Sequence, residues 1–179
     1  MKKKAIPFFL CFCMLLTLFS ACGKNENTPK DTVGIDEISA AITAEMKKDL
    51  MDAGGYKEED FATGGVPSYQ IASLKDEEFQ LPLEYDQERL EDALMINHQM
   101  NVKSDMIVVM KAKSDEDVAE LENYAKKLRD DQYKTWERYL PDQFEKVQQN
   151  VTKTVGHYVI YVTYDEPQKI ADAIENLLK

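Results

Sequence analysis

Apolar residues in the first third of the chain follow the spacing of an amphipathic helix. Between residues 35 and 50 they recur every three or four positions, which places them on one helix face, while charged residues occupy the other. The residues of this face are Ile35, Ile38, Ile42, Met46 and Leu50. Residues 56–80 follow two glycines and are weakly periodic, so we expect a loop there with a short strand around residues 69–72.

Two antiparallel hairpins are predicted in the second half of the chain. Residues 94–100 alternate between two faces, and the five consecutive apolar residues 106–110 follow after a turn-like interval. An unbroken apolar run of this length is typical of a strand that is covered on both faces or central in a sheet. A second pair of β-rich segments, 151–155 and 158–163, flanks a two-residue turn that contains Gly156.

Three further helices are predicted between and after these strands. Ser114, with Asp117 three residues later, forms a capping-box variant. It precedes a long helix whose buried stripe is Val118, Leu121, Ala125 and Leu128. Pro141 is expected to end this helix, and residues 142–149 can form a short one. Asp165 is the expected cap of a last helix, with a proline in its first turn and an inward face of Ile170, Ala173, Ile174 and Leu177.

The order of these elements is helix, two strands, long helix, two strands, helix. This order predicts an α+β domain in which an antiparallel sheet of about four strands carries helices on one face. We expect residues 35–179 to form this single domain, with the clearest patterning in residues 85–178.

The N-terminus has the features of a bacterial lipoprotein signal peptide. Lysines precede an apolar run over residues 5–19, which is shorter than the roughly 20 residues of a membrane-spanning helix. Ser20 and Ala21 supply the small residues before Cys22, and this segment resembles the lipobox of lipoprotein signal peptidases. We therefore expect residues 1–21 to be removed and Cys22 to carry the lipid. An ordinary secretory peptide, with an incidental Cys22, is the alternative.

Processing at this position would leave a strongly acidic chain. Three of the 22 Lys and Arg residues lie in the leader, so 19 remain against 33 Asp and Glu, a net charge of −14. Such a surface repels phosphate groups, so nucleic-acid binding is not expected and attachment to the membrane depends on the lipid. Residues 22–34 are polar and aperiodic, and we expect them to be a flexible tether at the extracytoplasmic face of the cell membrane.

Three segments resemble a known family of small lipoproteins of Firmicutes, mainly clostridial, that is catalogued only as a domain of unknown function. They are the run DMIVVMKAK at residues 105–113 with the acidic-capped helix after it, the Tyr139 to Pro141 segment, and the hairpin from Gly156 to Asp165. The likeness covers roughly residues 85–178 and the leader. It implies a Gram-positive setting, and it brings no agreed activity, cofactor or active site.

A soft-metal site is one candidate for chemistry. His98 and Met100 form an H-x-M pair, and Met95, Met106 and Met110 add thioethers on neighbouring strand positions. Imidazole and thioether ligands suit Cu(I). Methionine is also a common core residue, and the face that His98 shares is apolar, so we favour packing and expect neither a metal nor another cofactor.

Catalytic constellations are weak in this sequence. His157 is expected in a hairpin turn, and neither histidine lies in a nucleophile motif. Carboxylate pairs that could serve a cell-wall-directed hydrolase include Glu84 with Asp86, and the acidic group Glu88, Glu91 and Asp92. Solvated surface charge is the favoured explanation of these carboxylates, so a non-enzymatic role is favoured, although whether the protein is an enzyme stays open.

The aromatic residues near the end of the long helix are the candidate interface. Tyr133, Trp136 and Tyr139, with Phe144 nearby, could form an exposed anchor for a partner or close the end of the core. We expect a lipid-anchored module that binds a protein or a cell-wall glycan at the outer face of the membrane.

Overall fold

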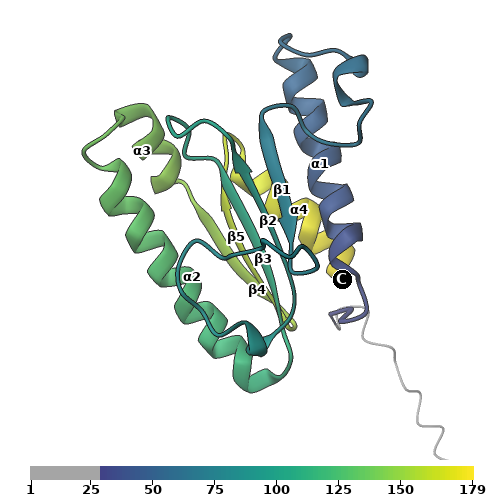
Figure 1. Cartoon of the computed structure of the whole chain (residues 1–179), viewed down its shortest axis with the longest axis vertical. Helices are drawn as coiled ribbons and strands as arrows, with labels where there is room; N and C mark the ends of the chain where they lie inside the picture. Colours follow the sequence, from purple (N-terminus) through teal and green to yellow (C-terminus); the bar gives the residue numbers. More distant parts are fainter. Residues whose placement is uncertain (1–28) are drawn as a thin grey trace, which may run out of the picture.

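A five-stranded antiparallel sheet forms the centre of the structure, a computed structural model that describes residues 29–179 (Figure 1). Its order is β1-β2-β3-β5-β4. The strands are β1 Tyr69–Ser73, β2 Leu90–His98, β3 Met106–Ala112, β4 Val151–Val155 and β5 Tyr158–Thr163. Both predicted hairpins are confirmed, as β2–β3 and β4–β5, and β1 confirms the short strand expected around residues 69–72. The sheet therefore has one strand more than the four expected.

The four α-helices cover both faces of this sheet. They are α1 Ile35–Asp52, α2 Asp115–Trp136, α3 Pro141–Gln148 and α4 Pro167–Leu178. In Figure 1, α1 and α4 lie on one side of the sheet and α2 on the other, where α3 packs against α2. The α+β class is confirmed, but the expectation of helices on one face is wrong.

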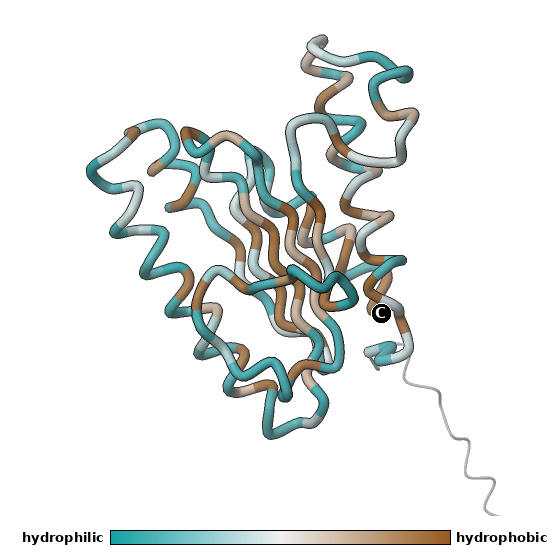
Figure 2. The backbone as a smooth tube through the Cα atoms, viewed as in Figure 1, coloured by the Kyte–Doolittle hydropathy of each residue, from teal (hydrophilic) through white to brown (hydrophobic). Residues whose placement is uncertain are grey.

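Alternation within the central strands explains the three layers. Val109 and Ile160 point into a core shared with α1 and α4, whereas Val108 and Val159 point into a core shared with α2. All four side chains are fully buried. A strand that buries both of its faces needs an apolar layer on each side. Figure 2 shows hydrophobic residues concentrated in the central strands and hydrophilic residues frequent in α2.

The predicted helix faces and caps agree with the structure only in part. On α4, Ile170 and Ile174 are buried as expected, but Ala171 and Leu178 are buried in place of Ala173 and Leu177. Ile35, Ile38, Ile42 and Met46 are buried as expected, and the Ser114 side chain accepts a hydrogen bond from the Asp117 backbone at the start of α2. The helix α2 ends at Trp136, well before Pro141, which instead begins α3. Asp165 does not cap α4, because Glu166 occupies that position.

Residues 29–34, at the end of the segment expected to be a tether, lie against the domain. Val33 is buried, and the Lys30 backbone N–H donates to the carbonyl of Leu178 at 2.7 Å. We call these six residues the strap. The predictions for residues 1–28, namely the signal peptide, Cys22 and the start of the tether, lie outside the described residues. Of the helices that the structure describes, none combines the length and apolarity needed to cross a membrane.

An ion-pair cluster on α4 predicts a specific acid sensitivity. Lys179 and Lys153 donate to the Glu175 carboxylate and lower the pKa of that side chain from 4.5 to about 2. A carboxyl whose pKa is depressed on folding stabilises the protein above its unfolded pKa and loses this effect as the pH falls through the folded value.

We therefore expect the free energy of unfolding to fall less in Glu175→Gln than in the wild type as the pH drops from about 4.5 to about 2. Urea titrations of both proteins across this range would measure the difference. Parallel pH profiles would contradict the assignment.

Candidate interaction surface

The domain has two distinct ends, and the strap marks one of them. β3 ends beside the strap, where Lys111 contacts Asp31, and α2 begins there, where Asp115 contacts His157. α1 also starts at this end, directly after the strap. The opposite end, which we call the distal end, therefore carries the β2–β3 and α2–α3 connections and the last turn of α1 (Figure 1).

The large hydrophobic side chains that are exposed among the described residues all lie at the distal end. Tyr139, in the α2–α3 connection, is 54% exposed, and Met100, in the β2–β3 connection, is 55% exposed. Met51, in the last turn of α1, is 36% exposed. Single exposed apolar residues are ordinary, but methionine and tyrosine are enriched in protein interfaces and here they gather at one end.

The structure divides the predicted aromatic interface into core and surface. Trp136 is only 6% exposed, and its indole N–H donates to the Gln132 side chain at 3.0 Å. Its ring packs beside that of Tyr139 at a centroid distance of 5.7 Å. Tyr133 is half-buried and meets Phe144 edge to face at 5.4 Å. Tyr139 is therefore the exposed member of this aromatic group, and its ring packs against the buried ring of Trp136.

Buried hydrogen bonds join the β2–β3 connection, which carries Met100, to α3, which directly follows the connection that carries Tyr139. Ser104, at the end of the β2–β3 connection, and Gln143, on α3, are both buried. The Ser104 backbone N–H donates to Oε1 of Gln143 at 2.9 Å, and its hydroxyl donates to the Gln143 carbonyl at 3.2 Å. Buried hydrogen bonds of this kind fix the two segments relative to each other.

An ion pair beneath this contact strengthens the link. Lys146 of α3 donates to Asp105 at 2.5 Å and to Asp165 at 2.7 Å, and the side chains of Lys146 and Asp105 are 10% and 5% exposed. The hydroxyl of Tyr69 donates to the other Asp105 oxygen at 2.7 Å. This network connects α3 with β1, with the start of β3 and with the segment after β5. It therefore holds the elements beneath the distal surface in fixed positions relative to one another.

Burial and charge shift the pKa values of this network in a consistent way. Burial raises the pKa of Tyr69, and the negative charge of Asp105 raises it further. For Lys146, burial lowers the pKa, but the hydrogen bonds to Asp105 and Asp165 outweigh it and leave the value raised. Lys146 therefore stays a cation and Tyr69 a neutral donor at physiological pH, which is the pattern of a structural network.

The candidate metal pair His98 and Met100 has another role in the structure. Nδ1 of His98 accepts a hydrogen bond from the Met100 backbone N–H at 3.0 Å, and the ring stacks edge to face on Tyr69 at 4.8 Å. Burial also lowers the pKa of His98, although the nearby Asp105 opposes this. An accepting Nδ1 leaves a proton on Nε2, so neither ring nitrogen offers a free lone pair.

The other methionines do not join His98. Met95, Met106 and Met110 pack in the core beside α2, whereas Tyr69, which stacks on His98, packs in the core beside α1. Within residues 29–179, no group of three or more His, Cys, Asp or Glu side chains is placed to hold a metal ion.

Three of the five carboxylates of the candidate hydrolase pairs take part in local structure. Asp86 caps a short 3₁₀ helix by accepting from the Glu88 backbone, and Asp92 accepts from the Ala93 backbone. Glu91 pairs with Lys111 at 2.7 Å. His157 lies in the β4–β5 turn, as expected, with Asp115 at 2.9 Å from its Nε2 atom.

Sequence reasoning missed the Asp105–Lys146 network. The two residues are 41 positions apart, and each resembles an ordinary surface charge in its local pattern. A usable signal is the position of Lys146 next to the buried Val147 and three residues after the buried Gln143, on the inward side of α3. A charged residue on the buried side of a helix predicts a buried partner.

The fold and this surface together define a three-layer α+β domain with a fixed, partly apolar end. Residues 66–164 match the family described as Domain of unknown function (DUF4358), which is more than half of the chain, and the chain belongs to this family. The matched range holds the whole sheet with α2 and α3, and leaves out α1 and α4. No curated protein and no solved structure matches the chain. The prediction of a domain of unknown function is thus confirmed, and the Firmicutes and lipoprotein parts of the resemblance stay predictions.

Proposed function

We propose that this protein is a lipid-anchored, extracytoplasmic interaction module that binds a partner protein through its distal surface. The observation that carries the proposal is the placement of the exposed hydrophobic side chains. They lie at the end opposite the strap, which leads back toward Cys22. An anchor at Cys22 would leave this end free of the membrane.

The character of the distal surface favours a protein over a glycan as the partner. Met100 stands on a connection that buried hydrogen bonds hold to α3, and Tyr139 lies just before α3 with its ring against the buried Trp136, so binding would cost little ordering of the surface. A rigid tyrosine beside an adaptable methionine is typical of protein interfaces. Recovery of cell-wall glycan instead of a protein would redirect the proposal.

Cross-linking on intact cells tests the proposed surface. We expect full-length protein to capture a defined partner, and Tyr139→Ser combined with Met100→Ser to weaken that capture about tenfold, as loss of interface anchors does. The fold should be unchanged, because both side chains are more than half exposed. A matched control is Lys113→Ser with Glu116→Ser, two exposed positions near the strap, which should leave capture intact.

The anchor has its own test. Cys22→Ser should move the protein from the membrane fraction to the soluble fraction, because the domain is acidic and has no other expected means of attachment. A protein that stays equally membrane-bound would overturn the lipid-anchored part of the proposal. Equal capture by the distal variants would overturn the assigned surface.

A further inference from the structure

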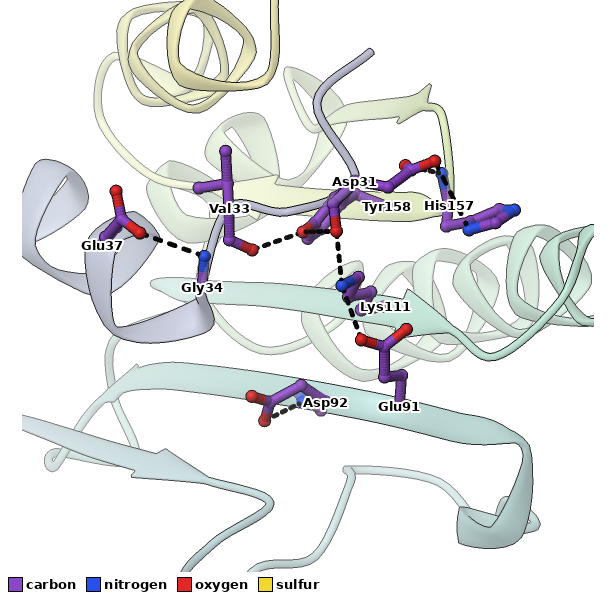
Figure 3. Close-up of polar contacts among 10 residues, drawn as sticks. Asp31, Val33, Gly34, Glu37, Glu91, Asp92, Lys111, His157 and Tyr158 are labelled. Atoms are coloured by element: carbon purple, nitrogen blue, oxygen red, sulfur yellow. Dashed lines mark hydrogen bonds and ion pairs between the residues drawn. The ribbon is translucent and has the colours of Figure 1, made fainter.

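The strap occupies a binding site that the domain provides for it (Figure 3). Nζ of Lys111 donates to the Asp31 carbonyl at 2.7 Å, and the hydroxyl of Tyr158 donates to the Val33 carbonyl. Both donors come from buried residues of the central strands. A buried donor without an acceptor is costly, so the strap carbonyls complete the polar bonding at this end of the sheet.

The β4–β5 turn is shaped to receive the strap. Gly156 has a φ of +55°, and a Cβ at this position would lie 2.8 Å from Cβ of Pro29 and 2.7 Å from Oδ1 of Asp31. The backbone N–H of His157 donates to the same Asp31 oxygen at 3.3 Å. Because the proline ring is rigid, any side chain at position 156 would displace the strap.

The strap also ties together elements that are distant in the sequence. Lys30 bonds to the end of α4, Asp31 to β3 and the β4–β5 turn, and Val33 to β5. The N-terminal segment therefore leaves the domain from a defined point, and in a defined relation to the sheet.

We propose that the strap is an orientation lock, which holds the β4–β5 turn toward the membrane anchor and the distal surface away from it. This inference rests on the proposed anchoring at Cys22. Covalent geometry limits the span from Cys22 to Pro29 to about 25 Å. If the strap came free as far as Ile35, the span would grow to about 45 Å and the domain could turn over.

Two glycine variants separate the lock from general strain. Gly156→Ala displaces the strap, whereas Gly64→Ala places an alanine at a similar positive φ, +79°, with no atom within 4 Å of its Cβ. Both substitutions place an L-residue at a positive φ, which strains the backbone, but only the Cβ added at position 156 contacts the strap. Hydrogen exchange of residues 30–34 should accelerate about tenfold or more in Gly156→Ala and stay near wild type in Gly64→Ala.

Orientation is measured in vesicles that carry the full-length, lipidated protein. The expected mature chain has no cysteine besides Cys22, so single labels can be placed at Met100→Cys, at the distal end, and at Glu116→Cys, near the strap. With the strap bound, energy transfer to acceptor lipids should be clearly stronger from position 116 than from position 100. In the Gly156→Ala background the two labels should approach the same value.

The outcomes distinguish this inference from the proposed function. Equal transfer from both labels in the wild-type strap, with the protein still vesicle-bound, would overturn the orientation lock alone. Unchanged exchange in Gly156→Ala would also overturn it. Vesicle binding that persists in Cys22→Ser would instead overturn the anchor on which both proposals depend.

Discussion

Asp105→Ala should be among the most destabilising single changes in the domain, lowering the free energy of unfolding by about 3 kcal/mol or more. The substitution leaves the Lys146 ammonium, only 10% exposed, with Asp165 as its remaining partner. It also removes the acceptor of the Tyr69 hydroxyl. The Lys146 ammonium would stay buried with only the exposed Asp165 carboxylate to compensate for its lost hydration, and this cost exceeds that of a lost surface ion pair. Urea denaturation followed by circular dichroism would measure the change.

Two further variants distinguish the loss of the buried Asp105–Lys146 ion pair from the loss of a charge at the surface. Lys75→Ala breaks an ion pair with Asp36 whose side chains are both more than half exposed, so the midpoint of denaturation should hardly move. Asp105→Asn keeps an acceptor for Tyr69 but loses the charge, and should fall between alanine and the wild type. If Asp105→Ala and Lys75→Ala lowered stability equally, the network would not be the base of the distal surface.

Hydrophobic periodicity was sufficient to predict most of the regular elements. The helix α1 and the hairpin β4–β5 match their expected bounds within two residues, because each has a strong local pattern and a local stop signal such as Gly156. Strand β1 was harder to predict, since five residues at a sheet edge bury little surface and carry a weak pattern. The spacing of apolar residues therefore predicts a helix or strand well where that element buries a continuous face.

The arrangement of layers could not be predicted in the same way. The consecutive buried residues Ile107 to Met110 indicate that β3 is covered on both faces, but they do not say which elements cover it. α1 and α4 meet on one face although more than 100 residues separate them in the sequence. Such a pairing depends on long-range packing, which a single sequence does not display.

The candidate surface was predicted in part. Residues 133, 136 and 139 recur at a spacing of three, so on an unbroken helix they would share one face. The helix α2 ends at Trp136, however, and Tyr139 therefore leaves that face and becomes exposed. The position of one helix end thus separates a core residue from a surface residue.

Trp136→Ala should accordingly destabilise the domain by about 3 to 5 kcal/mol, the usual cost of removing a large buried aromatic side chain. Its ring is 6% exposed, and the change would also leave the Gln132 side chain without its indole donor. Loss of this support would release Tyr139 as well, so partner capture should fall together with stability. A thermal or urea midpoint, measured beside the capture assay, follows both effects.

Tyr139→Ala is the matched change at the surface, and it decides between core and interface. Its side chain is 54% exposed, so its removal should alter stability by no more than about 0.5 kcal/mol while capture still falls. A stable Trp136→Ala variant would mean that the indole is not part of the core. Loss of capture in Trp136→Ala but not in Tyr139→Ala would show that unfolding, rather than a missing contact, explains the first result.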